Sequence, residues 1–203
     1  MSSTVACLTP PGQSALATLG LCGPLAWAAL RELFRPRQGV LPEAPEAGRF
    51  WLGQMGGDDV VLAVRQPGPV GVVELHCHGG REVVRWLLEQ LAERGLAEVD
   101  WEEHLRRTSA GAGHARSTAI LARAPTARTA AIALDQCNGA LTSALRGAVA
   151  LLEAGQTGRA ADAIGEVLRW APLGAHLSSP WRVTLAGPPN VGKSSLLNAL
   201  AGH

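Results

Sequence analysis

The chain has 203 residues, of which 47% are hydrophobic and 17% are charged, and its formal net charge at pH 7 is +1. A chain of this size and apolar content can bury a core, and its low charge excludes a disordered protein. The near-neutral charge also excludes recruitment of nucleic acid by a global field, so any RNA contact needs a local patch.

The sequence carries no sign of export or membrane insertion. No uncharged apolar run reaches the roughly 18 residues of a membrane span, and the N-terminus lacks the basic and apolar segments of a signal peptide. The four cysteines are widely separated and form no C-x-x-C pair, which favours buried thiols over a disulfide framework or a zinc site; they are Cys7, Cys22, Cys77 and Cys137. We therefore expect a cytoplasmic protein without membrane contact.

Residues 1–115 alternate short β-prone runs with two amphipathic segments. Strands are predicted at 4–8, 14–21, 49–55, 59–64 and 70–76, and helices are predicted at 25–34 and 81–94. Pro24 occupies a favoured first position of the first helix, and Gly95 closes the second. Strands and helices mixed in this way predict an α+β domain.

Residues 116–178 differ in character, because alanine and leucine dominate and strand patterns disappear. Two or three helices are expected, at 126–136, 140–154 and 159–170. Pro125, Gly155 and Gly158 punctuate them. This part is predicted to be an all-α region, and residues 172–180 are predicted to link it to the C-terminal segment.

The most informative segment lies at residues 187–194, whose sequence GPPNVGKS fits the phosphate-binding pattern G-x-x-x-x-G-K-[ST]. A short apolar run at 181–186 precedes it and predicts a buried strand. A helix-forming run at 195–201 comes after it, with Gly202 as a C-cap. Strand, glycine-rich turn and helix form the context that the pattern requires, so residues 179–203 are predicted to begin an α/β P-loop domain.

The chemistry of phosphate binding explains these residue types. Gly187 and Gly192 let backbone N–H groups approach phosphate oxygens closely. Lys193, the only lysine of the chain, would reach the β- and γ-phosphates, and the Ser194 hydroxyl would ligate Mg²⁺. The predicted nucleotide site comprises Gly187, Asn190, Val191, Gly192, Lys193, Ser194 and Ser195.

Other polar groups have competing interpretations. His76 and His78 share one face of a predicted strand, yet no further ligand of suitable spacing accompanies them, so structural or ligand-contacting roles are favoured over a metal site. An alternative is a small anion or ligand pocket at Gly79, Gly80 and the following helix N-terminus. The carboxylates of Asp100, Glu102 and Glu103 are interpreted as a solvated helix start rather than a catalytic pair. The arginines Arg116, Arg123 and Arg128 are interpreted as a solvated surface rather than an RNA contact.

Three segments together resemble the tRNA-modification GTPases of the MnmE or TrmE family. Residues 190–198, NVGKSSLLN, look like the loop and first helix of that family's GTPase domain. Residues 73–80, VELHCHGG, are similar to a more distinctive strand-to-helix segment of its N-terminal domain. The TPPG run at 9–12 matches in kind, and the resemblance covers nearly the whole chain in the same order.

The resemblance implies a dimerising, folate-binding-like N-terminal domain, a helical domain, and a GTPase domain inserted in it. Such proteins act with a flavoprotein partner on the wobble uridine of certain tRNAs. They hydrolyse GTP with Mg²⁺ in a K⁺-stimulated reaction. It also implies the domain limits 1–115, 116–178 and 179–203, the last being the incomplete start of the GTPase domain.

The chain departs from the family pattern in its N-terminal domain. Gly20 stands where the family has an arginine, and a loop before the HCHGG segment is shortened to residues 67–71. These departures argue against folate binding and leave Glu74 as the one anionic candidate for a pterin. Residues that read the base or position water have no place after Ser194, so we expect a fragment or a truncated relative.

Three functional hypotheses remain open. The first is a GTP-binding protein related to tRNA-modification GTPases, with Lys193 and Ser194 holding phosphate and Mg²⁺; its catalytic residues are unknown, as is GTP hydrolysis itself. The second is a catalytically incompetent relative that acts as a dimerisation or interaction module. The third is an ATP-using P-loop protein. Asn190 and Val191 favour GTP over ATP, but only through the family resemblance.

Overall fold

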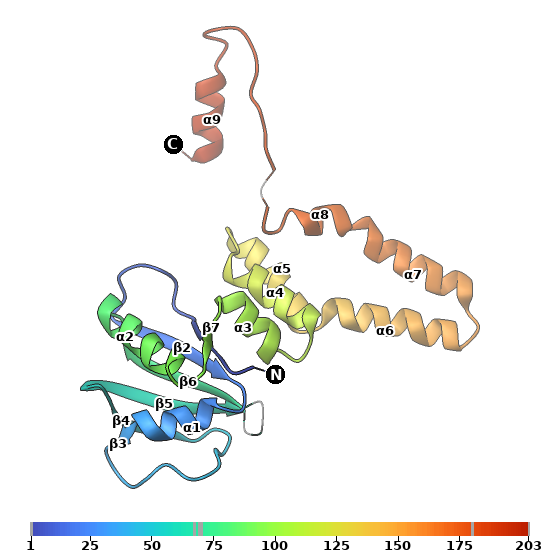
Figure 1. The fold of residues 1–203 in the computed structure, drawn as a ribbon. Helices are drawn as coiled ribbons and strands as arrows, with labels where there is room; N and C mark the ends of the chain where they lie inside the picture. The colour runs from blue at the N-terminus through green and yellow to red at the C-terminus, as the bar shows by residue number, and fades with distance from the viewer. Residues whose placement is uncertain (1, 67, 69–70, 180, 203) are drawn as a thin grey trace. The chain divides into compact units, whose positions relative to one another are not determined.

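The computed structural model describes residues 2–66, 68, 71–179 and 181–202. The chain forms two compact units that divide between Ala119 and Ile120, and each is described by itself. The first unit contains a mixed β-sheet with helices on its faces (Figure 1). Its strands are β1 (Thr4–Cys7), β2 (Leu16–Cys22), β3 (Arg35–Pro36), β4 (Phe50–Met55), β5 (Asp58–Gln66), β6 (Val72–His78) and β7 (Ala97–Glu98). Its helices are α1 (Ala26–Leu33), α2 (Arg81–Ala92) and α3 (Trp101–Thr108), and α4 (Ala112–Ala122) spans the division between the units.

The strands lie in the order β3-β4-β5-β6-β2-β1-β7. Neighbouring strands are antiparallel, except that β7 runs parallel to β1. The predicted hairpin at 49–64 is confirmed as β4 and β5, and its turn contains Gly56 and Gly57, both with positive φ. β7 lies outside every predicted strand, because two residues carry no periodic pattern and only pairing with β1 defines them.

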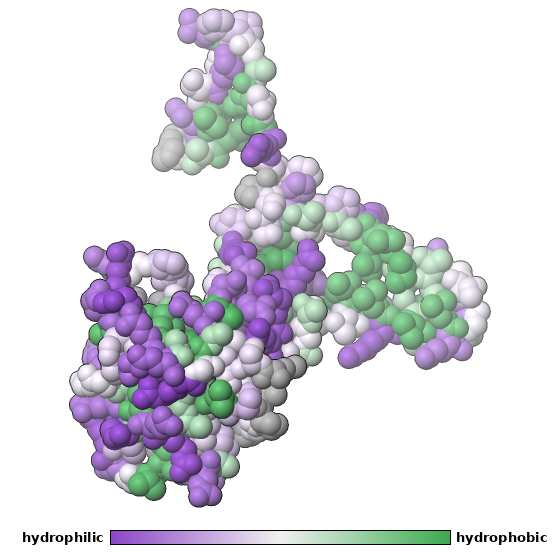
Figure 2. Space-filling model, viewed as in Figure 1, coloured by the Kyte–Doolittle hydropathy of each residue, from purple (hydrophilic) through white to green (hydrophobic). Residues whose placement is uncertain are grey.

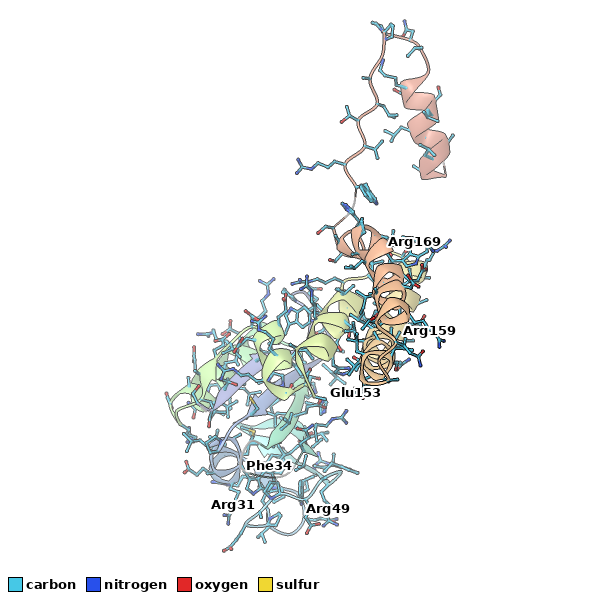
Figure 3. The ribbon with its side chains drawn as sticks, turned by 90° about the vertical axis from the view of Figure 1, so that its right-hand side faces the viewer. Arg31, Phe34, Arg49, Glu153, Arg159 and Arg169 are labelled. Carbon is cyan, nitrogen blue, oxygen red and sulfur yellow. The ribbon has the colours of Figure 1, made fainter. Side chains whose placement is uncertain are left out.

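The two faces of the sheet have different roles, because side chains alternate along each strand. One face carries Leu19, Leu62 and Leu75, which pack with α1 and α2 in a single apolar cluster. Phe34, at the end of α1, is fully buried in the same cluster (Figure 3). We call the opposite side, which carries Thr18, Gly20, Glu74 and His76, the outer face. α3 packs on β1 and β2 over part of it.

The second unit is helical as predicted. Its elements are α5 (Ala127–Cys137), α6 (Ala140–Glu153), α7 (Thr157–Arg169), α8 (Ala171–Ala175) and α9 (Lys193–Ala201). α6 and α7 pack side by side, with Ala148 and Ala160 buried (Figure 1). Large apolar side chains of these helices remain exposed in this unit, among them Leu145 and Val149 (Figure 2). Arg159 and Arg169 of α7 are exposed to solvent (Figure 3).

The strand predicted at 181–186 is not formed, which corrects that expectation. Residues 181–187 have no assigned secondary structure, and Trp181 and Val183 are 62% and 81% exposed. A β-strand exists only through hydrogen bonds to a neighbour, and no strand among the described residues pairs with this run. The helix predicted after the loop is confirmed as α9.

Among the described residues, no helix combines the length and the apolarity that a bilayer crossing requires.

Candidate functional site

Three residues of the loop before α9 have a positive φ. Gly187, Asn190 and Gly192 have φ values of 154°, 60° and 92°. Glycine reaches such values without a steric penalty, and asparagine tolerates the left-handed region better than most residues. The two glycines of the motif therefore stand where the chain turns against its normal handedness.

Lys193 folds back over this loop. Its Nζ donates hydrogen bonds to the backbone carbonyl oxygens of Gly187, at 3.0 Å, and Pro188, at 2.6 Å. The ammonium of the first residue of α9 thus bridges to the first residues of the loop and closes it into a ring. A cation is held at the point where the loop meets the helix.

The start of α9 adds unpaired donors to this cation. The first backbone hydrogen bond runs from the Leu196 N–H to the Gly192 carbonyl oxygen, at 2.9 Å. The N–H groups of Lys193, Ser194 and Ser195 therefore have no acceptor within the helix. Unpaired amides at a helix N-terminus and the positive end of its dipole together favour an anion.

The histidines of β6 have separate protein partners. On the outer face, His76 Nδ1 lies 3.0 Å from Thr18 Oγ1, and His76 Nε2 lies 3.4 Å from Glu74 Oε2. His78 Nδ1 lies 2.5 Å from Asp58 Oδ1. Within the described ranges, no group of three or more His, Cys, Asp or Glu side chains has a geometry that could hold a metal ion.

Gly79 is required by packing. A Cβ at Gly79 would overlap the Ser14 carbonyl oxygen, so the backbone of the β6–α2 connection is in direct contact with the segment before β2. Gly80 is the N-cap of α2. The contact with Ser14 accounts for the glycine at position 79. It therefore gives no support to the ligand pocket suggested at Gly79 and Gly80.

The carboxylates near residue 100 form the start of a helix, as predicted. Asp100 is the N-cap of α3, and its Oδ1 accepts a hydrogen bond from the Glu103 N–H at 2.7 Å. Glu103 pairs with Arg107 and Arg106, and these hydrogen bonds hold the pKa of Glu103 below its usual value. A carboxylate held in its ionised form by two guanidinium groups is a structural ion pair rather than a proton donor.

Cys22 and Cys77 are buried, as expected, whereas Cys7 and Cys137 are only half-buried, which corrects the expectation for these two thiols. Burial raises the pKa of Cys77 to about 11, with the charge of Asp58 adding to the effect. Because the thiolate is the reactive form, Cys77 is inert near neutral pH. The predicted surface arginines Arg116, Arg123 and Arg128 are exposed.

Sequence patterns missed two contributors to the outer face. Thr18 orients His76, and the alternation of β2 would have placed it beside β6 had the strand order been known. His104, one turn into α3, is buried against Gly20. No sequence pattern marks it, because its burial depends on where α3 crosses the sheet.

Comparison with known proteins gives family matches at the N-terminal and C-terminal ends of the chain. The family described as "GTP-binding protein TrmE N-terminus" matches residues 3–112. The family described as "50S ribosome-binding GTPase" matches residues 182–203. The predicted order of an α+β domain, a helical region and the start of a GTPase domain is thereby confirmed.

Individual relatives agree with this assignment. A tRNA modification GTPase MnmE of Phenylobacterium zucineum is 32% identical, over 100% of this chain and 53% of its own length. The MnmE of Symbiobacterium thermophilum is 33% identical, over 95% of this chain and 50% of its own. The MnmE of Thermotoga maritima is 29% identical, over 98% and 51%. The chain spans about half the length of these curated relatives, and it belongs to the MnmE/TrmE family.

Proposed function

We propose that this chain binds the phosphates of a guanine nucleotide, with Mg²⁺, at the loop between residues 187 and 195. The observation that carries the proposal is the position of Lys193 Nζ, held over the loop by the Gly187 and Pro188 carbonyl oxygens. A terminal phosphate placed before the α9 amides would meet this ammonium and the Ser194 hydroxyl together. Ser194 is the Mg²⁺ ligand in this proposal, and Asn190, Val191 and Ser195 complete the loop.

Family membership supports a wider role for the protein. The relatives are named tRNA modification GTPases, and we propose that this chain serves the same process, with tRNA and a flavoprotein as partners. Within this chain the proposed site contacts phosphate and Mg²⁺ only. We therefore expect the site to discriminate only weakly between guanine and adenine, so that ATP competes with GTP in part.

Titration of the chain with a fluorescent GDP analogue, with and without Mg²⁺, tests the phosphate site. Lys193→Ala is expected to weaken binding about tenfold or more, because a hydrogen bond to a charged group contributes roughly 1.5–3 kcal/mol. Inorganic triphosphate should displace the analogue, because the site holds phosphate rather than base.

Arg182→Ala is the matched control, since it removes an exposed positive charge from the same segment outside the loop. Equal affinity of the parent and Lys193→Ala for the analogue would refute the proposal. Equal losses in Lys193→Ala and Arg182→Ala would show general charge attraction instead.

A second candidate function is self-association through the N-terminal domain. The observation that favours it is apolar exposure on the outer face, where Phe50 and Leu52 of β4 are 66% and 51% exposed. Arg65 and Glu74 lie on the same face and pair at 3.3 Å, so the patch combines exposed apolar side chains with an ion pair. Its test is the oligomeric state of the chain in solution.

A further inference from the structure

The imidazole of His104 lies directly against Gly20 on the outer face. A Cβ at Gly20 would lie 2.6 Å from His104 Nε2, 2.8 Å from His104 Cε1 and 2.9 Å from Leu8 Cδ1. Real Cβ atoms do not approach other atoms this closely, so no residue larger than glycine fits without displacing the imidazole. The space beside β2 is thus filled by a side chain from α3.

The imidazole is enclosed by protein. His104 is 5% exposed, and its Nδ1 is a buried polar atom without a hydrogen-bond partner among the described residues. Burial lowers the pKa of His104, against the opposing charge of Glu74. The imidazole is therefore held by packing, although one of its buried polar atoms has no hydrogen bond to the described residues.

Glu74 is the direct cross-strand partner of Gly20, so the blocked position and this carboxylate are adjacent. Both oxygens of Glu74 already have partners: Oε1 lies 3.3 Å from Arg65 Nε, and Oε2 lies 3.4 Å from His76 Nε2. His76 is in turn held by Thr18. The carboxylate therefore belongs to a closed set of interactions within the sheet.

A pterin ring would need the opposite arrangement. Its amino group and ring N–H form a pair of parallel donors that match a carboxylate with both oxygens available. The flat ring also needs a slot beside that carboxylate. The family resemblance implies an arginine at the position of Gly20 and a folate in this domain. Here His104 occupies the space beside Gly20, and the Glu74 carboxylate already has protein partners.

We infer that His104 fills the ligand position of this folate-binding-like domain, so that this chain does not bind reduced folate and instead packs α3 directly on β2. The inference concerns the first unit alone and is independent of the phosphate loop. It can fail while nucleotide binding succeeds, and the reverse.

Equilibrium dialysis of the full chain against 5-formyltetrahydrofolate, a reduced folate stable in air, tests the loss of binding. The expected result is no saturable binding up to about 1 mM free ligand, while an unrelated folate-binding protein saturates under the same conditions. Saturable binding by the chain that Glu74→Gln weakens tenfold or more would overturn the inference, and so would saturable binding that Glu74→Gln leaves unchanged.

A double-mutant cycle tests the occupied position without any ligand. Gly20→Ala is expected to lower the melting temperature by about 5 °C or more, because overpacking a filled site is destabilising. In the His104→Ala background the same substitution should cost less than half as much, or restore stability. If Gly20→Ala fails to fold alone, folding of the double variant gives the same support. Equal costs in both backgrounds, or failure of both variants to fold, would overturn the inference.

Discussion

Two histidines of the first unit differ because their surroundings differ. His78 is exposed at the end of β6, and its hydrogen bond to Asp58 raises its pKa, with the charge of Asp58 adding to the effect. His104 is buried under α3, and loss of solvation lowers its pKa. Neither behaviour can be assigned from residue type, since both depend on which groups the fold places beside the ring.

The two shifts have opposite consequences for stability. The His78–Asp58 interaction contributes fully below the unfolded-state pKa of about 6.5, and its contribution is lost as pH rises through the raised folded-state value. His104 contributes stability above the unfolded-state pKa, and this contribution is lost as pH falls toward the lowered folded-state value. We expect NMR titration to give His78 a midpoint above the usual histidine value and His104 one below it.

Asp58→Asn provides the matched test of the His78 shift. It should lower the His78 midpoint and leave His104 unchanged. The free-energy difference between parent and variant should be larger at about pH 5.5 than at about pH 8.5. A His78 midpoint unaffected by the substitution would contradict the assignment.

At the scale of elements, the N-cap of α3 determines where this helix starts on the sheet. Asp100 is the N-cap of α3, and its side chain satisfies an otherwise unpaired N–H of the first turn. The same helix carries His104 onto the outer face four residues later. The start of α3 therefore sets which residue lies over Gly20.

Asp100→Ala should destabilise the first unit by about 1 kcal/mol, because the N-cap acceptor is removed. Hydrogen exchange in β2 and β6 measures the effect, since these strands lie at the centre of the sheet. Asp100→Asn retains an acceptor and should cost much less. Thr126→Ala removes the equivalent cap from α5 in the second unit and should leave exchange in the sheet unchanged. Equal losses for Asp100→Asn and Asp100→Ala would contradict a capping role.

At the scale of the whole molecule, the two units differ in how completely they are packed. The first unit has a continuous apolar cluster beneath its sheet, whereas the second leaves large apolar side chains exposed on α6, α7 and α9. The outer face of the sheet is apolar at Phe50 and Leu52, beside a pair of opposite charges. Exposed apolar patches of this kind mark interaction surfaces.

We expect the chain to sediment as a dimer, and Leu52→Asp to shift it toward monomer by placing a charge in the patch. Val40→Asp is the control, because Val40 is 84% exposed in the connection before β4 and belongs to no strand of the sheet. Sedimentation velocity over a range of concentrations makes the comparison. A parent chain that stays monomeric at about 100 µM, or a Leu52→Asp dimer as stable as the parent, would refute self-association through this face.

Patterns in the sequence predict most elements of the first unit, because alternation and helical periodicity are local properties. The hairpin of β4 and β5 and the helices α1 and α2 agree with the prediction to within a few residues. α4 and α8 were missed, since α8 has only five residues and α4 has a weak amphipathic pattern. The strand predicted at 181–186 was wrong, since a β-prone run becomes a strand only when a neighbour pairs with it.

The sequence by itself determined the phosphate-binding motif, the order of the segments and the family, because these depend on residue types at fixed spacing. Only the tertiary structure decided that β2 lies between β1 and β6, that Gly20 faces Glu74, and that His104 fills the space beside them. The physical reason is distance along the chain: each of these contacts joins residues more than ten positions apart, and only chain packing brings them together.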